Sequence, residues 1–294
     1  MMNLVEVKFP GLGINVDVNP VAFSIGSLEV YWYGLLIAAA IVLAVILAVK
    51  QAKSLNFPEG LVYDTILLII PCAIIGARIY FVACNWDYYG KDLKRIFDFR
   101  SGGLAIYGGI LLVFIGACVM CYIRKIPFRE LADYCVVYLP LGQAIGRWGN
   151  FFNQECFGTN TSLPWGMTSS TVQSYLSLNC PTLVSDMPVH PTFLYESIAD
   201  LIIFFILLQI RKKSKVPFET SCAYFALYGS VRFFIEGMRT DSLYIGGTGI
   251  RTSQLLSLIL VVAALIYIAV ARYKGFTKKS FPEKLYVEMT EEKK

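Results

Sequence analysis

The chain has 294 residues, of which 56% are hydrophobic and 16% are charged, and its mean hydropathy is +0.58. This composition excludes an ordinary soluble globular domain and predicts an integral membrane protein. The net charge of +5 does not indicate nucleic-acid binding, because the basic residues follow the topology of the predicted membrane spans.

Seven apolar runs are long enough to cross a bilayer, which takes roughly 20 residues in a helix. They predict an all-α membrane protein with spans near residues 27–49, 61–84, 103–123, 131–148, 191–210, 218–237 and 249–271. Helices one to four thus occupy residues 27–148, and helices five to seven occupy residues 191–271. The other segments are expected to be an external N-terminal arm, an interfacial arm, an external head and a cytoplasmic tail, at residues 1–26, 87–100, 149–190 and 272–294.

Two of these external segments carry short periodic patterns. Apolar residues alternate at Ile14, Val16 and Val18, which favours a short strand or an interfacial segment in the N-terminal arm. Residues 91–100 place Leu93, Ile96, Phe97 and Arg100 at helical spacing, which is typical of an amphipathic piece on the membrane surface.

Lys and Arg are divided unequally between the two sides of the predicted bundle. Sixteen fall on the side of the C-terminal tail, and seven fall on the side of the N-terminal arm and the head. Because cytoplasmic loops are enriched in these residues, the N-terminus is expected outside and the C-terminus inside. The other three, Arg78, Arg147 and Arg232, lie within or at the ends of spans, where an ionisable group is costly and usually functional.

The polar residues that are unusual for a membrane span share one predicted depth. All lie near the outer ends of the spans: Tyr33, Arg78, Tyr107, Arg147, Asn150, Glu155, His190, Arg232 and Glu236. A transporter is expected to place its site near the midplane, whereas this layer lies at the level of outer-leaflet headgroups. Two arginines beside an apolar cavity suit a phosphate diester, because guanidinium binds phosphate oxygens in a bidentate fork.

Purely structural interpretations of these residues also exist. Arg147 and the amides beside it could cap a helix and reach the headgroups. His190 could be a hydrogen-bond anchor at a helix entrance, and Arg78 could pair with a carboxylate or a headgroup. A ladder of ion pairs could explain the polar residues on one face of span six, which are Tyr228, Arg232, Glu236 and Arg239.

Eight cysteines are scattered along the chain, and in spans Cys usually behaves as a small apolar residue. Only Cys156 and Cys180 share the external head, where they form a disulfide if the surroundings are oxidising and the geometry permits. Cys118 and Cys121 form a C-x-x-C without a second pair, which does not favour a zinc site. We expect neither a metal nor a cofactor.

Several motifs resemble one known family. The run G-R-W-G-N-F-F-N-Q-E-x-x-G, from Gly146 to Gly158, is similar to the signature of bacterial prolipoprotein diacylglyceryl transferases. The resemblance continues in WYG, GARIYFV, SGGLAIYGG, HPTFLYE and YGSVRFFIE, and covers nearly all of the chain from Trp32 to Gln254. It implies a seven-helix enzyme that transfers the diacylglyceryl group of phosphatidylglycerol to a lipobox cysteine thiol and releases glycerol phosphate.

The resemblance also implies residue roles. The catalytic positions are Arg147, Arg232, Glu155 and Tyr107, the last standing where many members have a histidine proposed as a general base. Tyrosine, with an unperturbed pKa of about 10, is a poor base near neutral pH, so the base role at this position is not supported. Substrate binding is expected at Asn150, Tyr33, Arg78, Tyr228, Glu236, Arg239, His190 and Gly158.

In the expected mechanism, Arg147 and Arg232 bind the phosphate and stabilise its growing charge. Asn150 and Glu155 orient Arg147, and Glu236 holds Arg232. The partners are phosphatidylglycerol and prolipoprotein signal peptides with a lipobox cysteine, and the enzyme is a monomer in the bacterial cytoplasmic membrane with its site facing the outer leaflet. The alternatives are an outer-leaflet phospholipid headgroup hydrolase, which uses water as acceptor, and an anion or lipid transporter.

Overall fold

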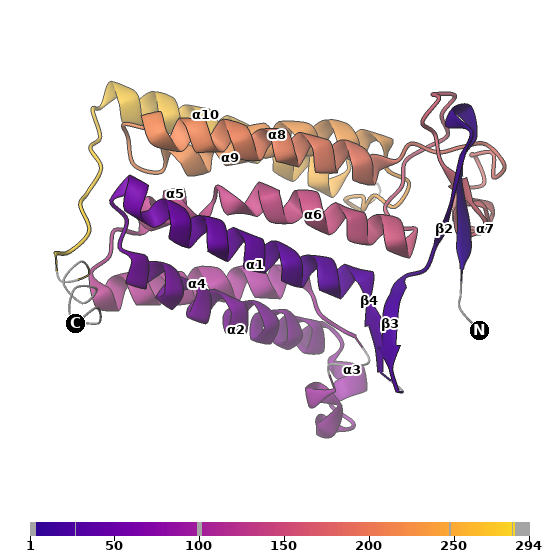
Figure 1. Cartoon of the computed structure of the whole chain (residues 1–294), viewed down its shortest axis with the longest axis horizontal. Coiled ribbons are helices and arrows are strands. Elements are labelled where there is room, and N and C mark those ends of the chain that lie inside the picture. Colours follow the sequence, from indigo (N-terminus) through magenta and orange to yellow (C-terminus); the bar gives the residue numbers. More distant parts are fainter. Residues whose placement is uncertain (1–3, 27, 99–101, 247, 284, 286–294) are drawn as a thin grey trace. The chain divides into compact units, whose positions relative to one another are not determined.

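The computed structural model describes residues 4–26, 28–98, 102–246, 248–283 and 285, and its elements are labelled in Figure 1. The chain divides into two compact units. Unit 1 consists of Met1–Ala44 and Ala132–Lys278, and unit 2 consists of Val45–Leu131 and Lys279–Lys294.

Unit 1 begins with short strands and continues into helices. Its elements are β1 (Val5–Phe9), the 3-10 helix η1 (Pro10–Leu12), β2 (Ile14–Val18), β3 (Val21–Ile25), β4 (Leu28–Tyr31), the first part of α1 (Trp32–Ala52), α6 (Tyr138–Asn153), β5 (Thr168–Ser169), α7 (Ser170–Asn179), α8 (Thr192–Lys213), α9 (Glu219–Met238) and α10 (Thr252–Tyr273). Unit 2 holds the rest of α1, η2 (Lys53–Leu55), α2 (Glu59–Cys84), α3 (Trp86–Tyr89), η3 (Leu93–Phe97), α4 (Ile106–Arg124) and the first part of α5 (Phe128–Cys135).

Among the described residues, five helices are long and apolar enough to cross a membrane. They are α1 with η2, α2, α4, α8 and α10, which correspond to predicted spans one, two, three, five and seven. The helix of the predicted sixth span, α9, has 20 residues but carries Glu219, Arg232 and Glu236. The chain is therefore a mostly helical membrane protein.

The fourth predicted span, residues 131–148, is not one continuous helix. The chain leaves α5 at Cys135 and begins α6 at Tyr138. Pro140 explains the break, because proline has no backbone N–H and its ring clashes with the carbonyl group four residues earlier. Helix α6 then continues to Asn153, so Arg147 and the residues just after it lie on a helix and not in a loop.

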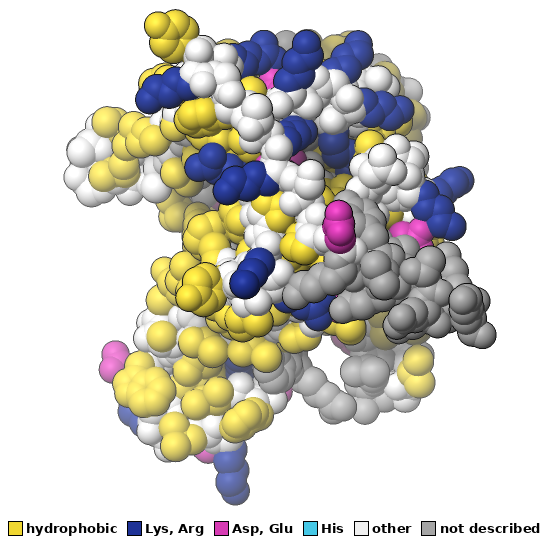
Figure 2. Space-filling view, turned by 90° about the vertical axis from the view of Figure 1, so that its left-hand side faces the viewer, with side chains coloured by type: hydrophobic (Ala, Val, Ile, Leu, Met, Phe, Trp, Pro, Cys, Tyr) yellow, Lys and Arg dark blue, Asp and Glu magenta, His cyan; other side chains and the backbone are white. Residues whose placement is uncertain are grey.

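The helices of unit 1 pack side by side, with α8 between α6 and α9, and with α10 against α9. Helices α6 and α9 end where α8 and α10 begin, and the head packs at this end of the unit. At the opposite end, the last turn of α8 carries Arg211, Lys212 and Lys213. Figure 2 views the protein from that end and shows Lys and Arg side chains gathered there.

The head has its own apolar core. Strand β1 pairs antiparallel with β2, with Val7 opposite Val16, and also with β5. Of the two alternatives for Ile14, Val16 and Val18, a short strand or an interfacial segment, the structure forms the strand. Strands β3 and β4 form a separate hairpin, so the chain is extended over residues 28–31, where the first helix was expected to have begun. This core combines residues of β1 and β2, of residues 149–190, of the C-terminal end of α6 and of the N-terminal end of α8: Val7, Val18, Phe151, Phe157, Met167, Val172, Leu176, Val189 and Phe193.

Unit 2 is built on close contact between α2 and α4. A Cβ atom on Gly76 would lie 2.4 Å from the carbonyl oxygen of Gly108, and one on Gly108 would lie 2.2 Å from that of Gly76. Both positions therefore require glycine. In the predicted interfacial arm, residues 87–100, the described residues form the end of α3 and the short η3 helix, and Arg100 lies outside the described residues.

Candidate functional site

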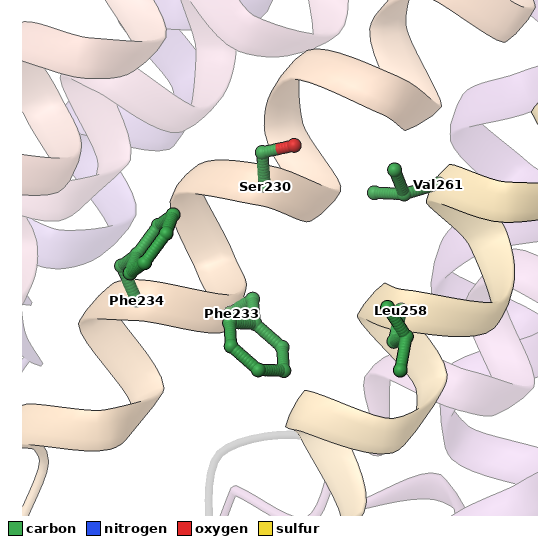
Figure 3. Close-up of a pocket in the computed structure, with 5 residues that line it drawn as sticks. All are labelled: Ser230, Phe233, Phe234, Leu258 and Val261. Carbon is green, nitrogen blue, oxygen red and sulfur yellow. The ribbon is translucent and has the colours of Figure 1, made fainter. Parts of the chain in front are cut away.

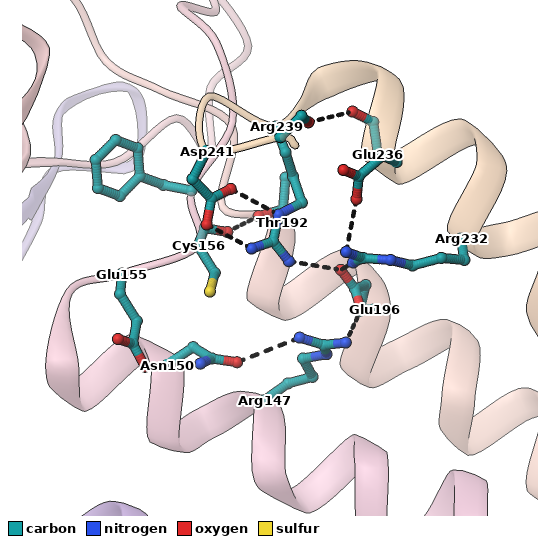
Figure 4. A network of polar contacts seen from close by, with 12 residues as sticks. Arg147, Asn150, Glu155, Cys156, Thr192, Glu196, Arg232, Glu236, Arg239 and Asp241 are labelled. Carbon is teal, nitrogen blue, oxygen red and sulfur yellow. Dashed lines mark hydrogen bonds and ion pairs between the residues drawn. The ribbon is translucent and has the colours of Figure 1, made fainter. Parts of the chain in front are cut away.

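The site in unit 1 is centred on a buried carboxylate, Glu196, in the first turns of α8 (Figure 4). Its side chain is about 2% exposed, and arginines from three positions converge on it. Arg147 on α6 pairs through Nη2 with Oε2, and Nη1 of Arg232 on α9 lies 2.8 Å from Oε1. Nη1 of Arg239 lies 3.8 Å from the same Oε1 atom. Three positive groups are thus held around one anion in a largely apolar bundle.

The amide expected beside Arg147 is in place. Because α6 is helical through Asn153, Asn150 lies one turn after Arg147, on the same face. Its Oδ1 accepts a hydrogen bond from Nη1 of Arg147 at 3.4 Å, and its Nδ2 donates one to Oε1 of Glu155 at 2.9 Å. Nδ2 of Asn153 also donates to that oxygen, at 3.2 Å. A chain of polar contacts therefore leads from Glu155 to Arg147 through Asn150.

Two further carboxylates fix the arginines at the end of α9. Nη2 of Arg232 lies 2.6 Å from Oε2 of Glu236, one turn later on the helix. Arg239 follows the helix as its C-cap residue, and its Nε and Nη2 donate to the two carboxylate oxygens of Asp241 at 2.8 and 2.6 Å. Burial acts to raise the pKa of Asp241, but the hydrogen bond and charge of Arg239 outweigh it and hold that pKa below its usual range.

Cys156 places a thiol among these charges. Figure 4 shows its sulfur directed toward the space between Glu155, Asn150 and Arg239, and its carbonyl oxygen accepts a hydrogen bond from the hydroxyl of Thr192. Burial raises the pKa of the Cys156 thiol, although the charge of Arg239 acts in the opposite direction. Both Cys156 and Cys180 are free cysteines in the structure.

Gly158 and His190 join the head to the ends of α8 and α9. The N–H of Gly158 donates to the carbonyl oxygen of His190 at 2.9 Å. A Cβ atom on Gly158 would lie 2.8 Å from that of His190 and 3.1 Å from the carbonyl oxygen of Met238. His190 Nδ1 lies 3.1 Å from the hydroxyl of Tyr195, and burial lowers the pKa of His190. These contacts describe a neutral hydrogen-bond anchor.

Two of the expected tyrosines lie in unit 1. Tyr228 stacks on Tyr224, one turn earlier on α9, with ring centroids 5.5 Å apart and an angle of 6° between the rings. Tyr33, in the first turn of α1, packs on α6 where a Cβ atom on Gly149 would lie 2.4 Å from its ring. The charges of Glu155 and Arg147 act on the Tyr33 side chain, so α1 contributes to the wall of this site.

Arg78 and Tyr107 belong to unit 2. Arg78 is 3% exposed, and its guanidinium donates to five backbone carbonyl oxygens, of Ile96, Gly102, Gly103, Arg95 and Asp98, at 2.7 to 3.0 Å. An arginine has five N–H donors, so the binding of a substrate oxygen by Arg78 requires the release of one carbonyl oxygen. Tyr107 lies in the first turn of α4 and is 62% exposed.

Three acidic residues of the site were not predicted from the sequence: Glu196, Asp200 and Asp241. Glu196 and Asp200 lie inside the apolar run of the fifth predicted span, where the argument that singled out the three arginines applies to carboxylates as well. Asp241 gave no comparable signal, because it lies in a polar turn. Its pairing with Arg239 follows from the way the chain leaves α9.

The hollow between α9 and α10 is less suited to a charged substrate than the site around Glu196. This hollow of about 340 Å³ (Figure 3) is lined by Ser230, Phe233, Phe234, Leu258 and Val261, with no charged side chain among them. Within the described residues, no group of three or more His, Cys, Asp or Glu side chains is arranged to hold a metal ion.

Comparison with known proteins gives consistent matches over most of the chain. A sequence profile of the family described as "Prolipoprotein diacylglyceryl transferase" matches residues 20–270. Proteins called phosphatidylglycerol–prolipoprotein diacylglyceryl transferase from Finegoldia magna and Clostridioides difficile are 44% and 42% identical to the chain. Each alignment covers 84% of this chain, and 93% and 92% of the respective relative. A Listeria monocytogenes protein of the same name is 41% identical over 87% of the chain and 91% of its own length.

Proposed function

Because the chain belongs to the prolipoprotein diacylglyceryl transferase family, we propose that it transfers the diacylglyceryl group of phosphatidylglycerol to the lipobox cysteine of a prolipoprotein. The product is a thioether, and glycerol phosphate is released. The relatives' names supply both substrates, and the lipobox thiol is the acceptor implied by the signature motif. This reaction is the first step of bacterial lipoprotein maturation.

The observation that carries the proposal is the convergence of Arg147 and Arg232 on Glu196. Two guanidinium groups from different helices meet at one anion in a place that is nearly closed to solvent. A phosphate diester carries one negative charge and presents oxygens that arginine binds in a planar fork. The position held by the Glu196 carboxylate is therefore suited to the phosphate of a lipid headgroup.

The reaction has two chemical demands. The thiol sulfur attacks the C3 carbon of the glyceryl group, and the bond between that carbon and the phosphate oxygen breaks, so the electron pair of this bond moves to the leaving phosphate. Arg147 and Arg232 stabilise the charge that grows there, a kind of interaction worth about 10²- to 10³-fold in rate when one donor is removed. The thiol proton ends on the phosphate of the product, so the overall reaction conserves protons.

The proposed placement in the membrane follows from the charge pattern. We place the N-terminus, the head and the site on the outer side of the cytoplasmic membrane, and the basic end of α8 on the inner side. Helix α9, and α6 with α5, are then the two further spans beside the five apolar helices, which gives seven. The site lies at the depth of outer-leaflet headgroups, and the enzyme acts as a monomer.

The test uses the purified protein in phosphatidylglycerol nanodiscs with a peptide whose apolar run ends in a lipobox cysteine. We expect intact mass spectrometry to show a peptide mass gain of one diacylglyceryl group, and no gain for a peptide with serine in place of that cysteine. Free diacylglycerol without a modified peptide would instead indicate a headgroup hydrolase. The absence of both products, modified peptide and free diacylglycerol, would refute the proposal.

A matched pair of variants tests whether the site carries the activity. Arg147→Ala should abolish the mass gain. Arg272→Ala removes a different arginine, whose Nη2 pairs with Glu219 at the other end of unit 1, and should leave the gain in place. Equal losses in the two variants would contradict the assignment of the reaction to the arginines around Glu196.

A further inference from the structure

Asp200 is the most completely buried acidic residue beside the site. It lies on α8 four residues after Glu196, and therefore on the same face of the helix. Its exposed fraction is 0%, and neither carboxyl oxygen has a hydrogen-bond partner among the described residues. An ionised carboxylate without hydrogen bonds is costly to bury, so burial favours the protonated form of Asp200.

The surroundings of Asp200 are polar and charged on both sides of α8. Helices α6 and α9 pack against α8, and the hydroxyl of Tyr224 on α9 donates to Oε1 of Gln143 on α6 at 3.1 Å. The charged and titratable groups that act on Asp200 from its own helix, from α6 and from α9 are Glu196, Arg147, Arg232, Tyr224 and Tyr228.

The terminal nitrogens of the two central arginines already have partners. Arg147 contacts Asn150 and Glu196, and Arg232 contacts Glu196 and Glu236. Each of these contacts occupies one N–H group, and a phosphate bound at the point where the two guanidinium groups converge takes the place of Glu196. The displaced carboxylate then lies close to a second anion in a nearly closed site, and two like charges at close range disfavour each other's ionised form.

We propose that Asp200 shares its proton with Glu196 when the lipid phosphate takes the place of Glu196 on the arginines. Residues four apart on a helix are neighbours, and a protonated carboxyl group donates one hydrogen bond. Asp200 is thus a positioning residue that receives the displaced carboxylate, and no covalent bond changes in this step. The inference rests on the proposed function, because it takes phosphatidylglycerol as the anionic donor.

The main test is the pH dependence of KM for phosphatidylglycerol in the peptide transfer assay, from about pH 6 to about pH 8.5. In the wild-type protein, KM should rise less with pH than in Asp200→Leu, because Asp200 supplies the proton. In Asp200→Leu, a proton must come from solvent, so KM should rise by up to about tenfold per pH unit. In Asp200→Asn, KM should stay flat, because the amide N–H donates to the displaced carboxylate.

Ile203→Leu is the packing control, since Ile203 is also buried on α8 and the substitution conserves volume. Its KM should vary with pH as it does in the wild-type protein. A second readout needs no turnover: glycerol phosphate added to the wild-type protein should shift an infrared band of a protonated carboxyl group, and the shift should be absent in Asp200→Asn. This readout also serves if Asp200→Leu does not fold.

A KM that rises by the same factor at every pH in Asp200→Leu would overturn the proposal, and so would an unchanged infrared band in the wild-type protein. The same pH slope in Asp200→Asn as in Asp200→Leu would also overturn it. Absence of transfer by the wild-type protein would refute the proposed function instead, and the infrared shift would still decide whether the proton is shared.

Discussion

Oε1 of Glu196 lies 2.8 Å from Nη1 of Arg232, and this contact joins α8 to α9 at the centre of the site. The contribution of this contact to the free energy of unfolding depends on its burial. Breaking a buried ion pair by removing one partner leaves an uncompensated charge and costs about 3 to 5 kcal/mol. The arginines around Glu196 are therefore held in place by a carboxylate that the fold cannot easily lose.

Replacement of Glu196 should consequently destabilise the protein. We expect Glu196→Ala to lower the free energy of unfolding by about 3 kcal/mol, measured by denaturant unfolding in detergent. Glu6→Ala removes a carboxylate whose pair with Lys8 is about half exposed, and should cost about 1 kcal/mol or less. Similar losses in the two variants would contradict the central role of Glu196.

The pair between Arg239 and Asp241 predicts a pH dependence of stability. The pKa of Asp241 is lower in the folded protein than in the unfolded chain, so the pair stabilises the fold above the unfolded pKa, and this contribution is lost as the pH falls through the folded pKa. Asp241→Asn should thus lower the melting temperature at neutral pH. The difference from wild type should shrink below about pH 4, and a difference that grows on acidification would contradict this.

The thiol of Cys156 should react slowly with alkylating reagents at neutral pH. Burial raises its pKa, and only the thiolate is nucleophilic. Site-resolved mass spectrometry after iodoacetamide treatment should show a labelling rate that still increases above about pH 9. A rate that levels off near neutral pH would mean that the arginines, and not burial, dominate the ionisation of Cys156.

The hydroxyl of Tyr107 is predicted to assist the reaction without acting as its base. Tyr107→Phe should keep measurable peptide transfer with a reduced kcat, because a tyrosine hydroxyl is a poor proton acceptor near neutral pH. A Tyr107→Phe protein that retains its melting temperature and binds lipid but transfers nothing would show that the hydroxyl is essential. Initial rates from peptide mass spectrometry make the distinction.

The sequence predicted much of the fold because membrane spans follow directly from apolar length. It did not predict the break between α5 and α6, where the local effect of Pro140 interrupts an apolar run that is long enough for a span. It also did not predict that α1 is preceded by a hairpin, because the apolar residues of β3 and β4 resemble the start of a helix in composition.

The candidate site was predicted from arginines that are energetically costly to place in a membrane span. Its geometry depends on partners that are far apart in the sequence. Arg147 and Arg232 were recognised because a charge in an apolar run is conspicuous. Glu196 was not, although a buried carboxylate in an apolar run is as costly as a buried arginine. The contact of Arg147 with Glu196 depends on the packing of α6 against α8, which no local pattern specifies.

The measurement that tests the central claim most directly is a double-substitution cycle on the two arginines. Arg147→Lys and Arg232→Lys keep the charge but lose the planar fork, and each should lower kcat/KM for peptide transfer by about 10²-fold or more. Because the two groups bind one phosphate as a unit, kcat/KM of the double variant should be only slightly lower than that of the less active single variant. Losses that multiply in the double variant, or a single variant with wild-type kcat/KM, would contradict a shared phosphate site.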